Sequence, residues 1–203
     1  RTGGGSMPPS CCSGVKNGRR VGQELRLQEI AKEVGVSQPT VKRWLSIAEA
    51  SGIIHLLRPY AHNVGKQLVK SPKLYFTDTG LVCHLLNLQN GKELSSSYLA
   101  GNIFENFVVN EIKKSWAHNG KEANFYFYRD NTGMEIDLII HAHGKYSCVE
   151  IKSKTSPDTH DAKWLNKAED LLPDLAENAS IVCMTEKAFP ISPSIVAHSI
   201  WQI

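Results

Sequence analysis

The chain has 203 residues, of which 41% are hydrophobic, and its composition is that of an ordinary globular protein. The net charge is +3, which is too small for bulk charge to bind nucleic acid, so any such contact must come from local clusters of cations. The sequence has no signal peptide and no long apolar stretch, which argues against secretion and against a membrane span.

The first part of the chain predicts a flexible segment followed by a helix-turn-helix. Residues 1–20 are rich in Gly and Ser and are expected to be a flexible tail or an appended sequence. After them, a first helix is predicted at about Leu27–Val34, a turn at Gly35-Val36, and a second helix whose N-cap is Ser37. This order is typical of a helix-turn-helix.

The second helix has an apolar stripe and a polar face. The predicted inward stripe consists of Val41, Trp44, Leu45 and Ala48. The residues predicted to face outward are types that reach phosphates and base edges in a DNA major groove: Gln38, Thr40, Lys42 and Arg43. The alternative interpretation is a domain that packs against another protein or against another part of the same protein.

A β-wing is expected after this helix. Gly52 ends the helix, and Ile53–Tyr60 with Lys66–Val69 form a predicted hairpin joined by residues 62–65. The module is therefore predicted to be a winged helix over residues 21–90. Residues 89–98 are polar and lack periodicity, so the boundary with a second domain, residues 91–203, is placed there.

The second domain is predicted to begin with a long helix at residues 99–116. Asn106, Asn110, Lys113 and Lys114 form one polar arc of this helix, and Glu105 and Glu111 lie outside that arc. A carboxylate on a buried flank must be paired, protonated or metal-bound. Either glutamate is a candidate site acid, and either could instead pair with Arg129.

A β-hairpin follows, with strands at residues 134–142 and 145–152 and a turn at His143-Gly144. If Ala142 pairs with Lys145, the same register places Asp137 opposite Glu150. Side chains opposite each other lie about 5 Å apart at Cβ, where two carboxylates repel unless one is protonated or a cation lies between them.

This carboxylate pair suits a hard divalent ion such as Mg²⁺. Glu150 and Lys152 share one face of the strand, so an ammonium lies beside the carboxylates. Such a group suits phosphodiester hydrolysis, with the lysine stabilising charge or orienting water. The alternative is that Glu135, Asp137, Glu150 and Lys152 are surface charges forming cross-strand ion pairs.

The remaining elements are predicted from apolar patterns. Residues 161–176 are expected to be a helix with Trp164, Leu165, Ala168, Leu171 and Leu172 inward, and Pro173 as a late kink or break. Ser180–Met184 is predicted to be a buried strand, and Ile195–Trp201 a strand or short helix.

Two motifs carry a resemblance to known families. Asp137 followed by Glu150-x-Lys152 resembles the signature of PD-(D/E)xK nucleases, whose core is a mixed sheet flanked by helices. More specifically, the chain after about Arg20 resembles the C-terminal region of AAA+ ATPases that carry the DUF4143 domain, through the segments Val36–Leu45, Ser51–Pro59, Lys70–Leu86, Gly101–Glu111, Tyr126–Leu138 and Val149–Lys152.

The resemblance implies an α/β fold in which a winged helix-turn-helix precedes a restriction-endonuclease-like domain. It implies Asp137, Glu150 and Lys152 as catalytic residues, with Glu105 as the helix-borne acid and Mg²⁺ or Mn²⁺ bound by Asp137, Glu150 and Glu105. The noncatalytic alternative is a regulatory arm that binds DNA or protein.

The resemblance also implies a larger protein. No Gly-x-x-x-x-Gly-Lys-Ser/Thr motif occurs here, so ATP is expected only in a missing N-terminal ATPase domain. The chain is therefore expected to be a C-terminal fragment whose partners are nucleic acid, chiefly DNA, and that ATPase domain, with no membrane.

The sequence also contains short clusters of cations and five cysteines. Candidate basic clusters are Lys42-Arg43, Lys66 with Lys70 and Lys73, and Lys152 with Lys154. The five cysteines show neither zinc spacing nor an even disulfide framework, which indicates a reducing, cytoplasmic compartment. Cys83, Cys148 and Cys183 are predicted to be small core residues.

Overall fold

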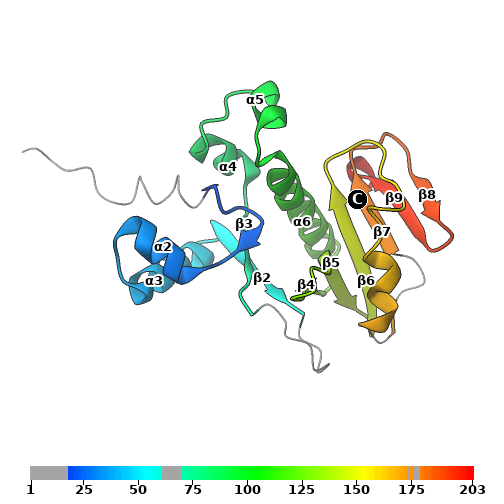
Figure 1. Ribbon diagram of the computed structural model, residues 1–203, viewed down its shortest axis with the longest axis horizontal. Coiled ribbons are helices and arrows are strands. Elements are labelled where there is room, and N and C mark those ends of the chain that lie inside the picture. The colour runs from blue at the N-terminus through cyan, green and yellow to red at the C-terminus, as the bar shows by residue number, and fades with distance from the viewer. Residues whose placement is uncertain (1–17, 61–69, 173, 176–178) are drawn as a thin grey trace, which may run out of the picture.

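The computed structural model describes residues 18–60, 70–172, 174–175 and 179–203 (Figure 1). Within these residues the fold is mixed α/β: nine strands form one mixed sheet in the order β1-β3-β2-β4-β5-β6-β7-β9-β8. The N-terminal helices lie at one end of the sheet and β8 at the other (Figure 1). None of the described helices is long and apolar enough to cross a membrane.

The two predicted N-terminal helices are confirmed. Helix α2 spans Leu27–Val34 and α3 spans Gln38–Ala50. Between them Gly35 has φ 73°, a left-handed conformation that favours glycine. The Ser37 side chain then accepts a hydrogen bond from the Thr40 N–H and caps α3. Local chemistry therefore determines this turn.

The prediction that Trp44 faces inward on α3 is wrong. Val41 and Leu45 are buried and Ala48 packs against the same cluster, but 37% of Trp44 is exposed. Ile47, on the same helix, is 54% exposed. Helix α3 therefore carries apolar side chains, Trp44 and Ile47, that are not buried in the hydrophobic cluster around Val41 and Leu45.

Three strands accompany these helices: β1 (Gln23–Glu24), β2 (Ile54–Pro59) and β3 (Lys73–Phe76). The expected strand at 66–69 lies outside the described residues, as do residues 1–17. The strand that pairs antiparallel with β2 is β3. On its other edge β2 pairs in parallel with β4, so the N-terminal strands and the C-terminal strands share one sheet.

Three helices connect β3 to β4: α4 (Thr79–Leu85), α5 (Gly91–Ser96) and α6 (Ala100–His118). The long helix is confirmed, but its polar arc is not fully outward, because Asn106 and Asn110 are buried. Asn106 accepts from the Phe76 N–H and donates to the Phe76 carbonyl, and Asn110 donates to the same carbonyl. Both side-chain amides therefore bind the backbone of Phe76, as a neighbouring strand would, and they attach α6 to the end of β3.

The C-terminal part of the sheet begins with β4 (Asn124–Arg129), β5 (Glu135–Ala142) and β6 (Lys145–Lys152). The predicted hairpin and register are confirmed, with pairs from Ala142↔Lys145 to Leu138↔Val149. The turn residues His143 and Gly144 have φ 52° and 73°, as a two-residue hairpin turn requires.

The chain then forms a 3-10 helix, η1 (Leu165–Asp170), three strands, β7 (Ala179–Cys183), β8 (Phe189–Ser192) and β9 (Ile195–Ser199), and a last 3-10 turn, η2 (Ile200–Gln202). The expected buried strand is therefore confirmed as β7. Ile195–Trp201 contains both of the predicted alternatives, a strand and a short helix.

The helix expected at residues 161–176 is much shorter, because only the 3-10 helix η1 forms there; Pro173, predicted to be a kink or break, lies outside the described residues. The Asp158 carboxylate accepts from the N–H groups of His160 and Asp161, and the Asp161 carboxylate accepts from the Asp158 N–H. These side-chain contacts form a cap that begins a helical turn, and the turns that follow have i→i+3 backbone hydrogen bonds, such as those from Lys163 to His160 and from Lys167 to Trp164. The inward positions are nevertheless right, since Leu165, Ala168, Leu171 and Leu172 are buried and Trp164 packs against them.

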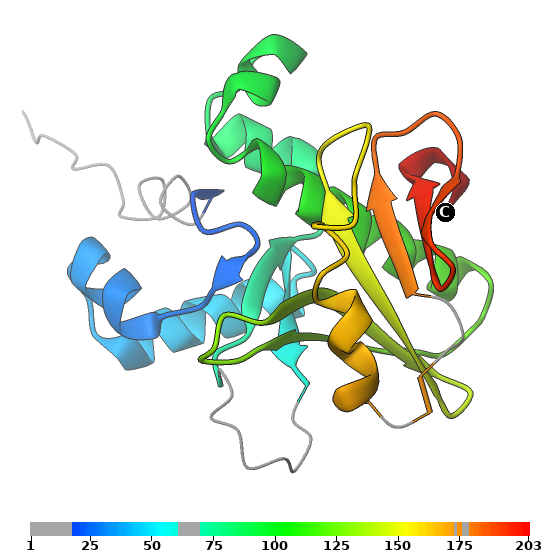
Figure 2. The same cartoon turned by 45° about the vertical axis from the view of Figure 1, so that its right-hand side comes forward.

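Helix α6 and η1 cover opposite faces of the sheet (Figure 2). Val108, Val109 and Ile112 of α6 pack on one face, together with Leu138, Ile140, Val149 and Ile151 of the hairpin. The η1 side buries Ile136, Ile139 and Cys148 against Ala168 and its neighbours. The hairpin is therefore buried on both faces, and any charged side chain on it requires a partner.

Candidate functional site

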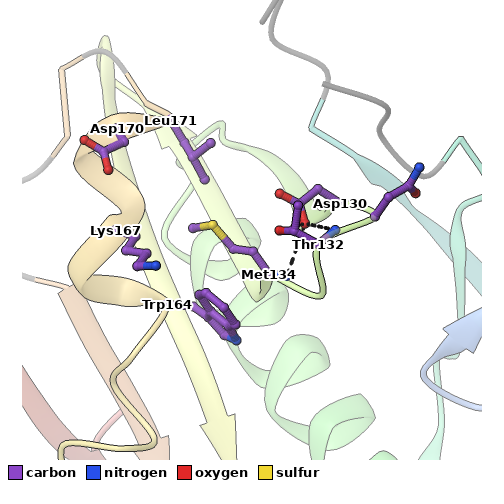
Figure 3. A pocket seen from close by; sticks show the side chains of 8 residues that line it. Asp130, Thr132, Met134, Trp164, Lys167, Asp170 and Leu171 are labelled. Atoms are coloured by element: carbon purple, nitrogen blue, oxygen red, sulfur yellow. Dashed lines mark hydrogen bonds between the residues drawn. The ribbon is translucent and has the colours of Figure 1, made fainter. Parts of the chain in front are cut away.

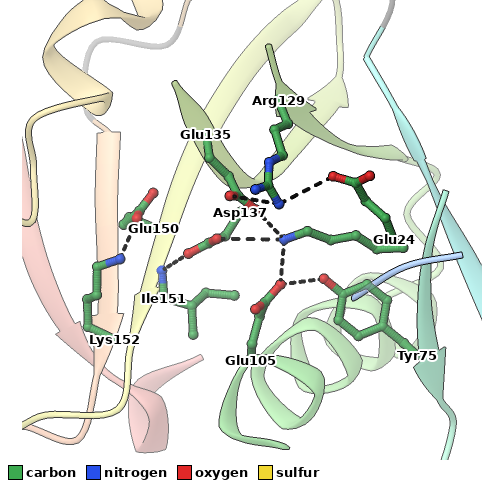
Figure 4. A network of polar contacts seen from close by, with 10 residues as sticks. Glu24, Tyr75, Glu105, Arg129, Glu135, Asp137, Glu150, Ile151 and Lys152 are labelled. Carbon is green, nitrogen blue, oxygen red and sulfur yellow. Dashed lines mark hydrogen bonds and ion pairs between the residues drawn. The ribbon is translucent and has the colours of Figure 1, made fainter. Parts of the chain in front are cut away.

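A β-bulge determines where the Asp137 side chain lies. On β4, Tyr126 pairs with Ile139 and Tyr128 pairs with Ile136, so Asp137 and Leu138 on β5 oppose the single residue Phe127. Such a bulge places an additional side chain on one face of a strand. The Asp137 carboxylate lies on the α6 side, close to Lys73 and Glu105 (Figure 4).

The predicted pairing of Asp137 directly opposite Glu150 is not formed: the β5–β6 ladder ends at Leu138↔Val149, and both acids lie just beyond this last pair. The Asp137 Oδ2 accepts a hydrogen bond of 2.9 Å from the Ile151 N–H, which connects β5 to β6 at this point. The negative charge of Asp137 still acts on Glu150, since it helps to raise the pKa of the Glu150 carboxyl.

Glu150 is buried, with 5% of the residue exposed. Its Oε1 lies 2.5 Å from the Lys152 Nζ, while its buried Oε2 has no hydrogen-bond partner within the described part of the chain. Burial first, and Asp137 second, raise the pKa of Glu150 to about 8. For Lys152, burial lowers the pKa, but the carboxylates of Glu150 and Asp137 outweigh burial and raise it.

Lys73, from β3, is a site residue that the sequence did not reveal. Its Nζ lies 2.8 Å from Glu135, 2.9 Å from Glu105 and 3.9 Å from Asp137. Burial lowers the pKa of Lys73, but these three carboxylates outweigh burial and hold the pKa above its ordinary value. The basic cluster predicted to contain Lys73 is therefore wrong, since only 3% of this side chain is exposed.

Of the two candidate glutamates on α6, Glu105 enters the cluster and Glu111 does not. The Glu105 Oε1 accepts a 2.5 Å hydrogen bond from the Tyr75 hydroxyl in addition to its contact with Lys73. Burial raises the pKa of Glu105, and Lys73 opposes the rise. Glu111 pairs with Lys114 on the exposed flank of α6. Neither glutamate pairs with Arg129 in the structure, which contacts Glu24 and Glu135.

A cavity of about 480 Å³ opens onto this cluster. Lys73, Glu105, Glu135 and Asp137 line it from inside, and three arginines, Arg20, Arg26 and Arg129, line it as well. Glu150 and Lys152 are not among its lining residues. Small solutes can therefore reach Asp137 from this side.

The chemistry of the donors fits one hard cation on the Glu150 side of the site. Asp137 and Glu150 supply carboxylate oxygens, and the partnerless Glu150 Oε2 is the atom that a cation would satisfy. On the Glu105 side the Lys73 ammonium already lies among the acids, within 4 Å of Glu105, Glu135 and Asp137. Among the described residues, no three His, Cys, Asp or Glu side chains are so grouped that they could hold a metal ion.

A second cavity, of about 360 Å³, lies between the turn after β4 and η1 (Figure 3). Asp130 and Trp164 are among its lining residues. The Asp130 Oδ1 accepts from the N–H groups of Thr132 and Met134 and from the Thr132 hydroxyl, so this oxygen stabilises the turn. The Nζ atoms of Lys163 and Lys167 lie 4.2 Å and 5.2 Å from the Trp164 ring centroid.

The nucleic-acid-binding candidates lie on α3, in a different part of the fold from the acids. Gln38, Lys42 and Arg43 are exposed as expected, and Thr40 is half-buried with its hydroxyl 2.9 Å from that of Ser37. Of the other predicted basic clusters, Lys152 and Lys154 pair with Glu150 and Asp161, and Lys66 lies outside the described residues.

Comparison with known proteins places the chain in a family. Residues 100–203, just over half of its length, match the model of a domain of unknown function (DUF4143), so the chain belongs to the DUF4143 family. Residues 18–92 match a second domain of unknown function (DUF8612). The resemblance to DUF4143 is thereby confirmed.

Two curated relatives carry no functional description. Uncharacterized protein Mb2031c from Mycobacterium bovis and uncharacterized protein Rv2008c from Mycobacterium tuberculosis are each 30% identical over 176 residues. The match covers 87% of this chain but 38% of each relative, so the chain spans well under half of their length.

Among solved structures, protein VC1899 from Vibrio cholerae is 13% identical with a TM-score of 0.33. That likeness, which covers 97% of this chain and 54% of the other, is too low to support an argument about fold.

Proposed function

We propose that the chain is a metal-dependent nuclease-like domain joined to a winged helix that binds DNA. The observation that carries this proposal is Glu150, whose buried Oε2 has no hydrogen-bond partner among the described residues. Its Oε1 binds the half-buried Lys152, and Asp137 is near enough to raise the pKa of Glu150. A burial of this kind is costly unless a cation or a proton compensates it.

Each residue has an assigned role. Asp137 and Glu150 hold the metal, which supplies charge neutralisation at the phosphoryl group and an activated water. Lys152, held at Glu150, stabilises the negative charge that develops on the phosphate oxygens. Glu105 is the helix-borne acid of the site, and its Oε1 binds Lys73 and the Tyr75 hydroxyl.

Fold arguments support the same assignment. The strands β4, β5, β6, β7 and β9 with α6 and η1 on their two faces agree with the mixed sheet and flanking helices of PD-(D/E)xK nucleases. Helices α2 and α3 followed by the β2–β3 hairpin agree with a winged helix. We further propose that an ATPase domain precedes this part in the full-length protein, as the DUF4143 resemblance implies.

The test is cleavage of single-stranded, duplex and supercoiled DNA by the purified chain with Mg²⁺ or Mn²⁺. We expect Asp137→Asn and Glu150→Gln to lower the rate by about a hundredfold or more, because each removes a ligand charge without changing shape. Glu186→Gln, which changes an exposed carboxylate after β7, is the matched control and should cleave normally. Equal rates in all four proteins would exclude these acids from catalysis.

DNA binding by α3 leads to a separate prediction. Lys42→Ala combined with Arg43→Ala should weaken duplex binding and reduce the slope of log affinity against log salt by about 2, because two phosphate contacts are lost. Lys92→Ala combined with Lys187→Ala removes the same charge from exposed positions elsewhere and should leave the slope unchanged. Fluorescence anisotropy at several salt concentrations measures both, and an unchanged slope in the α3 variant would contradict the assignment.

A second candidate function is favoured by the apolar surface of α3. Trp44, Ile47 and Ile53 are 37%, 54% and 46% exposed on this helix and just after it. Exposed apolar groups of this size are more typical of contacts with protein than with phosphate. The alternative is therefore a noncatalytic regulatory arm, and the absence of DNA affinity even at low salt would leave its protein-binding form.

A further inference from the structure

The Lys73 ammonium lies where a metal ion would meet the acids of the cavity. Its three carboxylate neighbours come from α6 and β5, whereas Lys73 itself is in β3. It is thus a cation from the N-terminal strands inserted among acids of the C-terminal part. Only 3% of its side chain is exposed, although the cavity reaches the same cluster.

The surroundings keep this ammonium in place. The Phe127 ring centroid lies 5.4 Å from the Nζ, and the Tyr75 hydroxyl binds the same Glu105 oxygen that Lys73 contacts. A lysine ammonium is a compact point charge, so it can replace one hard cation among carboxylates. With Lys73 present, there is no space for a second cation between Glu105 and Glu135.

Lys73 also restrains Asp137. The Asp137 Oδ1 is directed toward the ammonium at 3.9 Å, and its Oδ2 accepts from the Ile151 N–H at 2.9 Å. The carboxylate is therefore oriented from two sides by groups that are not metal ligands. Across β6, the Glu150 Oε1 binds the Lys152 ammonium, and its Oε2 has no hydrogen-bond partner among the described residues, so this oxygen is free to bind a metal ion.

We propose that Lys73 is a positioning residue that occupies one of two cation positions in the site, so that the chain binds a single divalent ion, at Asp137 and Glu150. The inference deepens the proposed function and rests on it for the occupied metal position. It assigns the strand β3, and with it the DUF8612 region, a direct part in the metal site.

The experiment counts bound Mn²⁺ by electron paramagnetic resonance of the free ion. We expect the unmodified chain to bind one ion, Lys73→Arg to bind one, and Lys73→Met to bind two, because the methionine leaves the inner position without a cation. Lys114→Met removes a lysine from an exposed Lys–Glu pair on α6 and should still bind one. Circular dichroism confirms that each protein is folded.

If Lys73→Met does not fold, the same count is made on the double variant Lys73→Met with Glu135→Gln. The double variant loses one charge of each sign, and it keeps Glu105 and Asp137 as ligands for the second ion. A second ion in either variant supports the proposal. Equal stoichiometry in the folded variants and the unmodified chain overturns it, as does binding of two ions by the unmodified chain. If the unmodified chain binds none and the variant binds one, Lys73 has its assigned role but the metal-dependent function fails.

Discussion

Replacing Lys73 by methionine is expected to lower the free energy of unfolding by about 3–5 kcal/mol, the usual cost of removing one partner from a buried ion cluster. The Nζ is within 3 Å of both Glu105 and Glu135, and both carboxylates are mostly shielded from water. Methionine has a similar length and can still pack over Phe127. The decrease in the free energy of unfolding therefore comes from the missing charge, and urea unfolding at neutral pH measures this decrease.

The matched control for this change is Lys114→Met, which breaks the exposed pair with Glu111 and is expected to cost about 0.5 kcal/mol or less. The double variant with Glu135→Gln should recover part of the loss, because one uncompensated carboxylate becomes neutral. If Lys73→Met is no less stable than Lys114→Met, the acids around Lys73 do not depend on its charge.

Stability is expected to fall as pH rises between about 4.5 and 8, because of Glu150. Burial and Asp137 raise its pKa from 4.5 to about 8 in the folded chain. The folded state therefore binds one more proton than the unfolded state in this window. The contribution is fully present below pH 4.5 and is lost as pH passes through 8, a change of about 2–5 kcal/mol.

Glu150→Gln isolates this contribution, because glutamine stays neutral at every pH. Urea unfolding of the variant and of the unmodified chain, in unit steps across the window and without divalent ions, should give curves that diverge as pH rises, with the variant the more stable at the alkaline end. Glu111→Gln, at an exposed carboxylate, should follow the unmodified chain. Parallel curves for Glu150→Gln would show that Glu150 ionises as readily in the folded state as in water.

The N-terminal helices show how much can be read from neighbouring residues. Ser37 as a cap, Gly35 in a left-handed turn and the His143-Gly144 hairpin turn each depend on contacts within a few residues. Short-range rules therefore predicted these boundaries and the β5–β6 register. The same rules predicted the inward residues of 161–176 but not the type of helix, because the cap formed by Asp158 and Asp161 is followed by 3-10 turns in place of an α-helix.

The candidate site shows the limit of that reasoning. Asp137, Glu150 and Lys152 were found from one hairpin, because their spacing alone places them near each other. Lys73 and Tyr75 reach Glu105 from about 30 residues away along the chain. The only sequence signal for Lys73 was a lysine at the head of the apolar run Leu74-Tyr75-Phe76, and that signal does not distinguish a buried cation from a surface one.

By itself, the sequence determined the family, the two N-terminal helices with their turn, and the β5–β6 hairpin that carries Asp137, Glu150 and Lys152. Only the tertiary structure decided that a bulge turns Asp137 toward α6, that Asn106 and Asn110 are buried against Phe76, and that Lys73 lies among the acids. The physical reason is that these features depend on which strand lies beside β5 and which helix covers it. Such long-range packing can bury a charge or an amide that the local pattern assigns to the surface.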